Sequence, residues 1–263
     1  INSTFACAFT AKRNNIKITH IEAGLRSFDN EMPEEINRIL TDKISDYLFI
    51  HNEEARKNLV KENTNKNKIF NVGNIIINTY FLFKKEISYS NILNKLKINK
   101  RNYILITIHR PSNVDNSKEL NIIKNQLLKL SALYKLILIK HPRLIKLDKF
   151  FYKHLNNKNI ITSDPLDYFD FTNLLINSKA ILTDSGGVQE EAIFHNVPTG
   201  IIRKNTERKI ALRKNTNILI RDNKNIYKMM KKITEYKVAK RKIIPLWDNK
   251  VANRIYRILK YRI

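Results

Sequence analysis

Short apolar runs alternate with helix-length amphipathic segments along almost the whole chain of 263 residues. Continuous apolar runs of this length are typical of strands that are buried on both faces of a sheet. The expected strands are Ile16–Ile21, Tyr47–Ile50, Ile69–Val72, Tyr103–Ile108, Leu136–Ile139, Ile160–Thr162, Ala180–Leu182, Thr199–Ile202 and Ile218–Ile220. The expected helices are Glu34–Ile44, Glu53–Glu62, Ile75–Lys84, Lys118–Leu133, Tyr168–Asn177, Val188–His195, Asn225–Tyr236 and a terminal helix at Lys250–Ile263. This alternation predicts an α/β fold with parallel sheets covered by helices.

The alternation lapses once, between Lys84 and Asn102, where the chain is polar and rich in Lys and Asn. We interpret this stretch as the boundary between two α/β domains. The expected domains are 1–90 and 91–245, and a terminal helix at 246–263 follows the break at Pro245. The chain opens with a helical pattern at Asn2–Phe9, whereas an α/β domain rarely begins with a helix that has no strand to cover. We therefore expect either a sequence boundary or a missing amino-terminal segment at this point.

The net charge of +25 would by itself suggest a nucleic-acid partner. The excess, however, comes from 34 lysines against 15 arginines, accompanied by 34 asparagines, which is a composition that AT-rich codons favour. The basic residues are also spread along the chain, without a recognisable nucleic-acid module. We expect no specific nucleic-acid partner, although an anionic substrate would still be attracted by the positive field.

Compartment and membrane association can be judged from the same composition. The single cysteine, Cys7, allows no internal disulfide framework and fits a reducing cytoplasm. Apolar runs such as Tyr103–Ile108 are far too short to span a membrane. The chain opens without a charged-then-apolar leader. We expect a cytoplasmic protein without a membrane partner.

Ionisable residues gather directly after the first expected strand. The segments His20-Ile-Glu-Ala-Gly-Leu-Arg26 and Pro33-Glu-Glu-Ile-Asn-Arg38 place carboxylates and arginines close together in the chain. Residues just past a strand are a frequent site of acid/base chemistry in α/β proteins, which makes Glu22, Glu34, Glu35 and Arg38 candidates. A solvated pair formed by Glu34 and Arg38 on one helix face is the simpler alternative.

A second cluster, Thr183-Asp-Ser-Gly-Gly-Val-Gln-Glu-Glu191, has the strand–glycine–helix form that binds phosphate groups. Gly186 and Gly187 allow backbone N–H groups to approach an anion, and the helix N-terminus favours negative charge. Glu190 and Glu191 lie in the first turn of the expected helix, where a carboxylate is favoured electrostatically whatever its role, and one of them could accept hydrogen bonds from ribose hydroxyls. Ser185 could equally serve only as the N-cap of the helix.

Two further strand ends are basic. His109-Arg110 ends the run Tyr103–Ile108, and His141-Pro-Arg143 ends the next expected strand. At the carboxyl edge of a parallel sheet such residues could contact phosphate or move a proton, although a solvated loop pair is the simpler reading of His109 and Arg110. Together the three clusters predict an enzyme that acts on a nucleotide-linked substrate.

Eight short segments, taken in order, resemble the non-hydrolysing UDP-N-acetylglucosamine (UDP-GlcNAc) 2-epimerases. They are HIEAGLRS, PEEINR, VGN, TIHRPSNVD, HPR, PLDYFDF, TDSGGVQEEA and TER. The resemblance runs from about Asn2 to the terminal helix. It implies two Rossmann-like domains, as in glycosyltransferase-B enzymes, with the active site in the cleft and UDP bound by the domain at 91–245. It also implies inversion at C2 by elimination of UDP and its re-addition, with no cofactor and no metal.

The resemblance implies roles for individual residues. Glu22 and Glu34 match the acidic residues implicated in proton transfer, and His109 matches the essential histidine near the phosphates. The substrate-binding residues that the resemblance implies are Arg38, Arg110, Leu166, Phe171, Ser185, Gly186, Gly187, Glu191 and Arg208. The expected partners are a UDP-amino sugar and a second copy of the chain in a homodimer.

This sequence departs from the family pattern in two places. The family usually has Pro-Glu after TER, whereas this chain has Lys209-Ile210, so the local geometry is expected to differ. The family's first strand and a catalytic aspartate just before the position of Asn2 have no counterpart here, so we expect a first domain that is incomplete by about ninety residues. Two alternatives stay open, which are an epimerase of a related UDP-amino sugar and an inactive, truncated UDP-binding remnant.

Overall fold

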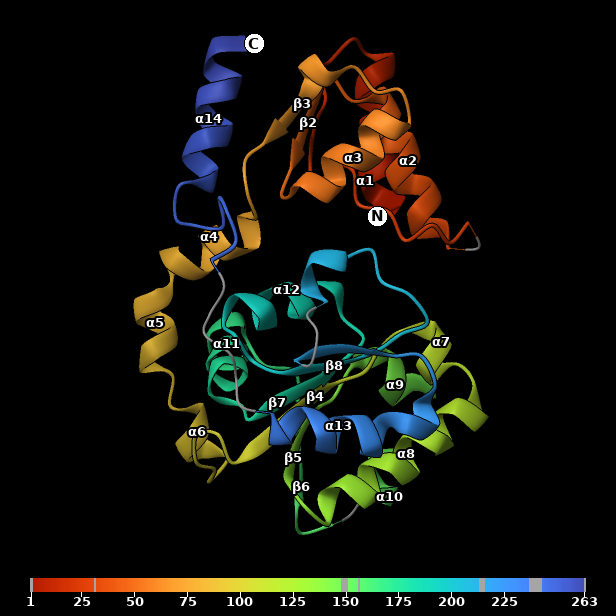
Figure 1. Ribbon diagram of the computed structural model, residues 1–263, viewed down its shortest axis with the longest axis vertical. Coiled ribbons are helices and arrows are strands. Elements are labelled where there is room, and N and C mark those ends of the chain that lie inside the picture. Colours follow the sequence, from red (N-terminus) through yellow and green to blue (C-terminus); the bar gives the residue numbers. More distant parts are fainter. Residues whose placement is uncertain are drawn as a thin grey trace. The chain divides into compact units, whose positions relative to one another are not determined.

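The computed structural model describes residues 2–30, 32–147, 151–155, 157–212, 216–236 and 243–262. The chain divides into two compact units. Unit 1 consists of Ile1–Leu82, Glu207–Ile210 and Lys242–Ile263, and unit 2 consists of Phe83–Thr206 and Ala211–Arg241. Each unit contains a parallel sheet with helices packed on it (Figure 1), so the predicted α/β fold with parallel sheets is confirmed.

Unit 1 has a three-stranded sheet in the order β1-β2-β3. Its strands are β1 (Thr19–Ile21), β2 (Tyr47–Ile50) and β3 (Ile69–Asn71), and its helices are α1 (Asn2–Arg13), α2 (Pro33–Ile44), α3 (Glu53–Lys61), α4 (Ile75–Leu82) and α14 (Val251–Arg262). The central strand β2 is buried on both faces. Leu48 and Ile50 pack with α3, whereas Phe49 packs with Val251 of α14. This double burial explains why β2 reads as a continuous apolar run.

Unit 2 has a six-stranded parallel sheet in the order β6-β5-β4-β7-β8-β9. The strands are β4 (Tyr103–Thr107), β5 (Lys135–Ile139), β6 (Ile160–Ser163), β7 (Ala180–Thr183), β8 (Thr199–Ile202) and β9 (Asn217–Ile220). The helices are α5 (Lys84–Tyr89), α6 (Ile92–Lys95), α7 (Pro111–Val114), α8 (Ser117–Ser131), α9 (Pro142–Leu147), α10 (Phe151–His154), α11 (Tyr168–Asn177), α12 (Gly186–Phe194) and α13 (Ile226–Glu235). Among the residues that the structure describes, short 3₁₀ helices are η1 (Lys66–Lys68) in unit 1, η2 (Lys209–Ala211) and η3 (Asn223–Asn225).

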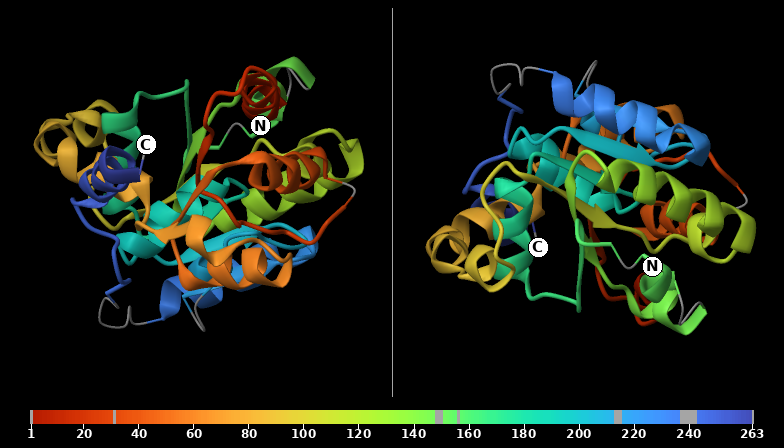
Figure 2. Two further views of the ribbon diagram at one scale, coloured as in Figure 1. Left: turned by 90° about the horizontal axis from the view of Figure 1, so that it is seen from above. Right: turned by 90° about the horizontal axis from the view of Figure 1, so that it is seen from below.

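Helices cover both faces of the six-stranded sheet. On one face α8 and α13 lie side by side (Figure 2), and their apolar side chains pack on Ile104 and Ile106 of β4. On the other face α11 and α12 pack on Leu105 of β4 and on neighbouring strands. Successive residues of β4 therefore enter opposite cores, because side chains alternate along a strand.

The strand order of unit 2 determines where a ligand can bind. The chain winds outward in one direction through β4, β5 and β6, and then returns to the centre and winds the other way through β7, β8 and β9. β4 and β7 are thus hydrogen-bonded neighbours whose outgoing connections turn to opposite sides. In doubly wound sheets this switch point opens a crevice at the carboxyl ends of the strands.

Most of the expected elements lie within a few residues of the observed ones. Tyr47–Ile50, Thr199–Ile202 and Tyr168–Asn177 have the expected bounds, whereas the first strand is shorter than expected and begins at Thr19. The polar stretch Lys84–Asn102 contains two short helices, α5 and α6, where no helix was predicted. Within the described residues, no helix combines the length and apolar character that crossing a membrane requires.

Candidate functional site

A pocket of about 210 Å³ lies at the carboxyl edge of the six-stranded sheet, beside the switch point. We call it the sheet-edge pocket. Its lining residues follow β4, β5, β6 and β7 and include part of α11 and α12: Thr107, Ile108, His109, Ile139, Lys140, His141, Pro142, Pro165, Leu166, Phe171, Ser185 and Val188. Four residues that the sequence singled out therefore line one pocket, namely His109, Leu166, Phe171 and Ser185.

Asp184 ties the loops after β4 and β7 together. This fully buried residue follows β7, and its carboxylate accepts hydrogen bonds from the backbone N–H groups of His109 at 3.0 and 3.1 Å and Arg110 at 2.9 Å. Asn113 of α7 donates its side-chain amide to the same carboxylate at 2.9 Å. Because a buried carboxylate is stable only when donors surround it, this network fixes the backbone at the rim of the pocket.

The His109 ring lies between Asp184 and His141. Its Nδ1 is 3.1 Å from Oδ1 of Asp184, and its ring stacks on that of His141 with centroids 4.9 Å apart. Burial lowers the pKa of His109 below its usual value, and the electrostatic influence of His141, Arg110 and Arg203 lowers it further, while the negative charge of Asp184 opposes them. The His109 ring is therefore mainly neutral near pH 7.

Ser185 occupies the N-cap position of α12 but does not cap the helix with its side chain. Its backbone N–H instead donates to Oγ1 of Thr183, which is itself hydrogen-bonded to Thr107. The helix thus begins with Gly186 at the sheet edge and without a side-chain cap from Ser185. A helix N-terminus whose first backbone N–H groups have no side-chain cap is suited to bind an anion.

Two buried carboxylates, Glu190 and Glu191, follow on α12. Burial, together with the smaller effect of the negative charge of Glu190, raises the pKa of Glu191 to about 7, although a contact with the Tyr168 hydroxyl opposes both. Within the described residues, Oε1 of Glu191 is buried without a hydrogen-bond partner. A ligand that donates hydroxyl groups would satisfy this oxygen and favour the ionised form.

In unit 1, the chain leaves β1 through a left-handed turn. Glu22 has φ of 68° and Gly24 has φ of 78°, a region that L side chains rarely adopt. Gly24 also passes close to α3, because a Cβ atom added there would lie 2.5 Å from the carbonyl oxygen of Ala55. The glycine of the HIEAGLR segment is thus required by backbone geometry, and the turn presents Glu22 at the end of β1.

A buried ion network holds this turn on α2 and α3. Arg26 is 1% exposed and contacts Asp42 of α2 at 2.8 Å, and it donates two hydrogen bonds of 2.7 Å to Glu62. Asp42 also accepts from the N–H of Gly24 at 3.0 Å and lies 2.6 Å from Nδ1 of His20. Arg26 and Asp42 therefore stabilise the conformation of the turn, and the contact with Asp42 also holds His20 in place.

Glu34 and Glu35, adjacent in the first turn of α2, have different surroundings. Glu35 is buried, and its carboxylate accepts from the N–H groups of Ser27 at 2.9 Å and Phe28 at 3.0 Å. Glu34 is half-buried and forms no hydrogen bond or ion pair with any residue that the structure describes. The structure thus separates a carboxylate that organises a loop from one that is available for chemistry.

Glu22 begins a chain of alternating charges. Arg208 donates from both terminal nitrogens to the Glu22 carboxylate at 3.3 Å, and its Nε lies 3.9 Å from Glu207. Glu207 is also 3.6 Å from Arg38, which in turn is 3.7 Å from Glu35. Three residues that the sequence singled out, Glu22, Arg38 and Arg208, are therefore brought together. Among the described residues, Arg38 pairs with Glu35 and Glu207, so the simpler alternative of a solvated pair with Glu34 is not observed.

A second pocket, of about 370 Å³, opens beside this charge chain. Its lining comes from the ends of β1, from α1 and from α2, and comprises Thr4, Thr19, His20, Ile21, Glu22, Asn37, Arg38 and Thr41. One wall is thus polar and carries both signs of charge. This lining suits a polar ligand whose hydroxyl or amide groups can both donate and accept.

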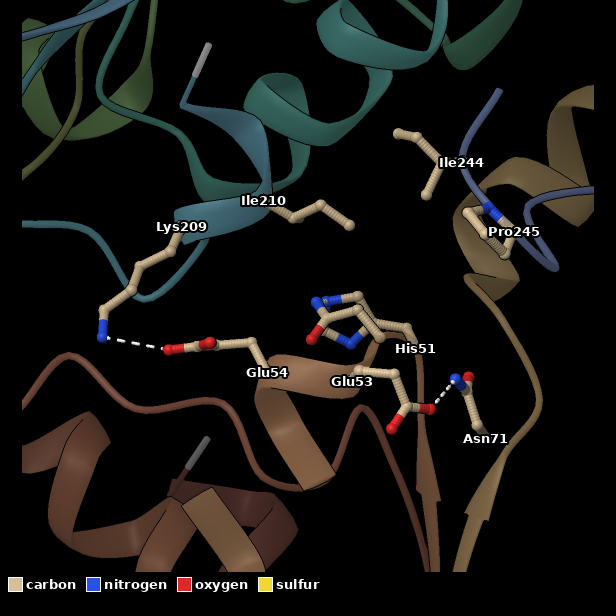
Figure 3. Close-up of a pocket in the computed structure, with 9 residues that line it drawn as sticks. His51, Glu53, Glu54, Asn71, Lys209, Ile210, Ile244 and Pro245 are labelled. Atoms are coloured by element: carbon tan, nitrogen blue, oxygen red, sulfur yellow. Dashed lines mark hydrogen bonds and ion pairs between the residues drawn. The ribbon is translucent and has the colours of Figure 1, made fainter. Parts of the chain in front are cut away.

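Lys209 and Ile210, which replace the usual Pro-Glu after the TER segment, line a third pocket of about 390 Å³ (Figure 3). Lys209 donates to Glu54 at 3.2 Å and lies 4.8 Å from the ring centroid of Phe28. These contacts hold the segment after Arg208 against α3. The substitution is thus compatible with an ordered contact between Arg208 and Glu22.

Sequence patterns did not single out Asp42, Asp184 or Glu207 as functional. Asp184 carried a weak signal, since it directly precedes the glycine loop, but its partners His109 and Asn113 are more than seventy residues away in sequence. Glu207 lies inside the TER segment and was overlooked in favour of Arg208. Among the described residues, no three His, Cys, Asp or Glu side chains gather in a way that would hold a metal ion.

The strand order, the glycine-led helix at the switch point and the basic strand ends define an α/β protein of the nucleotide-binding type. Residues 1–260 match the model of the UDP-N-acetylglucosamine 2-epimerase family, and the chain belongs to this family of isomerases. Its sequence is 41% identical over 270 residues to the UDP-N-acetylglucosamine 2-epimerase of Methanocaldococcus jannaschii, covering 99% of this chain and 73% of that protein.

Two further comparisons bear on the site. A crystal structure of the M. jannaschii UDP-GlcNAc 2-epimerase in complex with UDP-GlcNAc and UDP is similar with a TM-score of 0.90 and 39% identity, covering 99% of this chain and 74% of that chain. The UDP-2,3-diacetamido-2,3-dideoxy-D-glucuronate 2-epimerase of Pseudomonas aeruginosa is 38% identical over 210 residues, covering 78% of this chain and 57% of that protein.

Proposed function

We propose that this protein epimerises UDP-GlcNAc at C2 to UDP-N-acetylmannosamine (UDP-ManNAc), which a cytoplasmic pathway uses to make surface polysaccharide. The observation that carries the proposal is the sheet-edge pocket, where His109 and Ser185 meet at the switch point of a nucleotide-binding sheet. Family membership supports the substrate, since the M. jannaschii relative has been crystallised with UDP-GlcNAc and UDP. We further propose that the protein acts as a homodimer.

Unit 2 supplies the nucleotide-binding residues of this proposal. The N-terminus of α12, at Ser185, Gly186 and Gly187, binds the diphosphate through backbone N–H groups. Leu166 and Phe171 line the apolar part of the pocket and contact the uracil. The buried Glu191 carboxylate accepts hydrogen bonds from the ribose hydroxyls.

Basic side chains stabilise the leaving group. His109 and Arg110, at the end of β4, lie beside the diphosphate and stabilise the charge that develops there. Arg208, from the TER segment, contributes a guanidinium group near the nucleotide, and Arg38 supports it through Glu207.

Glu22 and Glu34 act on the sugar. One carboxylate takes the C2 proton as the C1–O bond breaks, and the C2–H electron pair becomes the C1=C2 double bond of 2-acetamidoglucal. The C1–O electron pair leaves with UDP. Re-addition of UDP, with protonation of C2 from the opposite face, gives the epimer. Two carboxylates are needed because a single group cannot serve both faces.

A related UDP-amino sugar is a second candidate substrate. The observation that favours it is the 38% identity to the P. aeruginosa enzyme, whose name specifies a diacetamido-glucuronate. That sugar carries an extra carboxylate, which a chain with a net charge of +25 would attract. Parallel assays of the two substrates at equal concentration separate the candidates, since the correct substrate should have the higher kcat/KM.

The reaction itself can be followed by proton NMR after incubation with UDP-GlcNAc in deuterium oxide. We expect two UDP-sugars at equilibrium, both carrying deuterium at C2, and no free sugar. Glu22→Gln should lower kcat by about 10²-fold or more, because the amide cannot exchange a proton. Stoichiometric release of free N-acetylmannosamine would contradict the proposal, and binding of UDP without any turnover would identify a nucleotide-binding remnant instead.

A further inference from the structure

Asp184 determines which nitrogen of His109 carries the hydrogen. A carboxylate oxygen of Asp184 lies 3.1 Å from Nδ1 of the ring, so an Nδ1 without hydrogen would place its lone pair against a negatively charged oxygen. In the neutral ring the hydrogen must therefore be on Nδ1, and the lone pair must be on Nε2. The same carboxylate accepts from the backbone N–H of His109, so the ring and its main chain are held by one group.

The other ring nitrogen, Nε2, lies on the edge of the ring away from the Nδ1 contact with Asp184. Asp184 is fully buried on the Nδ1 side, whereas 30% of the His109 side chain is exposed, and His109 lines the sheet-edge pocket. No residue that the structure describes forms a hydrogen bond to Nε2 of His109. The stacked His141 ring restricts rotation of His109, and its own Nδ1 accepts from the backbone N–H of Arg143 at 3.2 Å. The Nε2 lone pair is therefore the part of this ring that a ligand meets.

We propose that Asp184 is a positioning residue that makes His109 a proton acceptor for nucleotide binding. Asp184 keeps the hydrogen on Nδ1 and supplies a compensating negative charge, and His109 takes up a second proton at Nε2 when the diphosphate of a UDP-sugar binds. The resulting imidazolium donates from Nε2 to the diphosphate, where the negative charge develops as the sugar leaves. This inference rests on the proposed function, because it takes a UDP-sugar as the ligand.

The charges around His109 explain why the proton arrives with the ligand and not before it. His141 after β5, Arg110 at the start of α7 and Arg203 after β8 all oppose a positive charge on His109, as does burial, and Asp184 alone favours it. The pKa of the unliganded ring is lowered accordingly. The two negative charges of a diphosphate would reverse this balance, since an opposite charge within a few ångströms favours the charged form.

Glu191 must be separated from His109 in any measurement. Its pKa of about 7 implies that a carboxyl group partly protonated near neutral pH loses its proton when ribose hydroxyls donate to it. Proton release at Glu191 and proton uptake at His109 have opposite signs and would partly cancel. Glu191→Gln removes the release and leaves the uptake, so this variant isolates the contribution of His109.

The first test is a histidine ¹⁵N NMR spectrum of the full chain, which reports the tautomer directly. We expect His109 to have the hydrogen on Nδ1 at pH 8 and to become doubly protonated at pH 7 when UDP-GlcNAc is added. UDP-GlcNAc is a suitable probe because its diphosphate is a diester and does not titrate near neutral pH. A hydrogen on Nε2 in the unliganded protein, or bound UDP-GlcNAc without protonation of His109, would overturn the inference while leaving the proposed function standing.

The second test is calorimetry of UDP-GlcNAc binding to Glu191→Gln in buffers of different ionisation enthalpy. We expect uptake of close to one proton at pH 7 to 8, and an affinity that falls about tenfold per pH unit in that range. Asp184→Asn should abolish the uptake, whereas the control Asp164→Asn, made at a carboxylate that is 82% exposed after β6, should leave it unchanged. Uptake that persists in a folded Asp184→Asn protein would overturn the role of Asp184, and failure of UDP-GlcNAc to bind would instead refute the proposed function. If Asp184→Asn does not fold, the tautomer measured in the unmodified chain still decides the question.

Discussion

Arg208 donates from both of its terminal nitrogens to the two carboxylate oxygens of Glu22, each at 3.3 Å. This paired geometry is the strong form of an arginine–carboxylate contact, and the Arg208 side chain is only 7% exposed. It connects the TER segment to the residue after β1. A UDP diphosphate that also attracts Arg208 would compete with Glu22 for the same guanidinium group.

The first prediction concerns Arg208. Arg208→Ala should lower kcat/KM for UDP-GlcNAc by about 10²-fold or more, because it removes the guanidinium group that we propose lies near the nucleotide, and loss of a charged contact of this kind costs about 2–5 kcal/mol. Lys209→Ala is the matched control, since the neighbouring Lys209–Glu54 pair is roughly half-exposed and contributes little. Steady-state kinetics of the two variants provide the check, and equal losses in both would refute a specific role for Arg208.

The second prediction separates two adjacent carboxylates. Glu35→Gln should reduce the free energy of unfolding by about 1–3 kcal/mol, because the amide places N–H donors against the N–H groups of Ser27 and Phe28. Glu34→Gln should change it by less than about 0.5 kcal/mol but should lower kcat. Urea unfolding and kinetics on both variants test this division. The assignment of a structural role to Glu35 and a catalytic role to Glu34 would be contradicted if Glu34→Gln proved to be the destabilised variant.

The third prediction concerns stability against pH. The pKa of Glu191 is raised by burial to about 7 in the folded protein, above its value near 4.5 in an unfolded chain. A raised folded pKa stabilises the protein below pH 4.5, and this stabilisation is lost as the pH rises towards 7. The full loss amounts to about 3 kcal/mol above pH 7. Glu191→Gln should therefore stabilise the unliganded protein at pH 8 more than at pH 5, as measured by denaturant unfolding at the two pH values.

Glu191→Gln should have opposite effects on two quantities, the stability of the protein and its affinity for UDP. The same substitution that stabilises the unliganded protein at pH 8 should weaken its affinity for UDP, because a neutral amide is a weaker acceptor for ribose hydroxyls than a carboxylate. A variant that gained neither stability nor a change in pH dependence would contradict the burial argument for Glu191.

The fourth prediction concerns the ion network formed by Arg26, Asp42 and Glu62 beneath the turn that follows β1. Arg26→Met keeps much of the side-chain volume but leaves the buried Asp42 without its charged partner, which should cost about 3–5 kcal/mol. Glu62, the other partner, is partly exposed and can be rehydrated. Thermal and urea unfolding should show the loss, and the variant Arg56→Met, at a half-exposed arginine of α3, should show almost none.

The sequence predicted the strands well because a strand that is buried on both faces consists of consecutive apolar residues, which are easily recognised. β2 and β8 were located to the residue for this reason. Helices of four to six residues, such as α6 and α7, were missed because so few residues carry no detectable period. The polar composition between Lys84 and Asn102 also concealed α5, whose single described buried residue is Ile87.

In the candidate site, too, residues that form one short motif could be recognised from the sequence, whereas contacts between residues far apart in the sequence could not. Ser185, Gly186 and Gly187 could be recognised because one loop contains the whole signal. Asp184 holds His109 across 75 residues of sequence, and Arg208 reaches Glu22 across 186, so neither pair could be found from spacing. The sequence also offered no way to distinguish Glu34 from Glu35, since their difference depends on which backbone N–H groups lie nearby.

The dissociation constant for UDP, measured by calorimetry on the unmodified chain and on Glu191→Ala and Glu22→Gln, tests the central claim most directly. The account predicts that the chain binds UDP, that Glu191→Ala weakens binding about tenfold or more through the lost ribose contact, and that Glu22→Gln leaves the constant within about twofold. Glu22 should not matter for this measurement because its proposed role is in proton transfer at the sugar, which UDP lacks. Equal affinity of Glu191→Ala and the unmodified chain for UDP would contradict the assignment of the nucleotide site to the carboxyl edge of the six-stranded sheet.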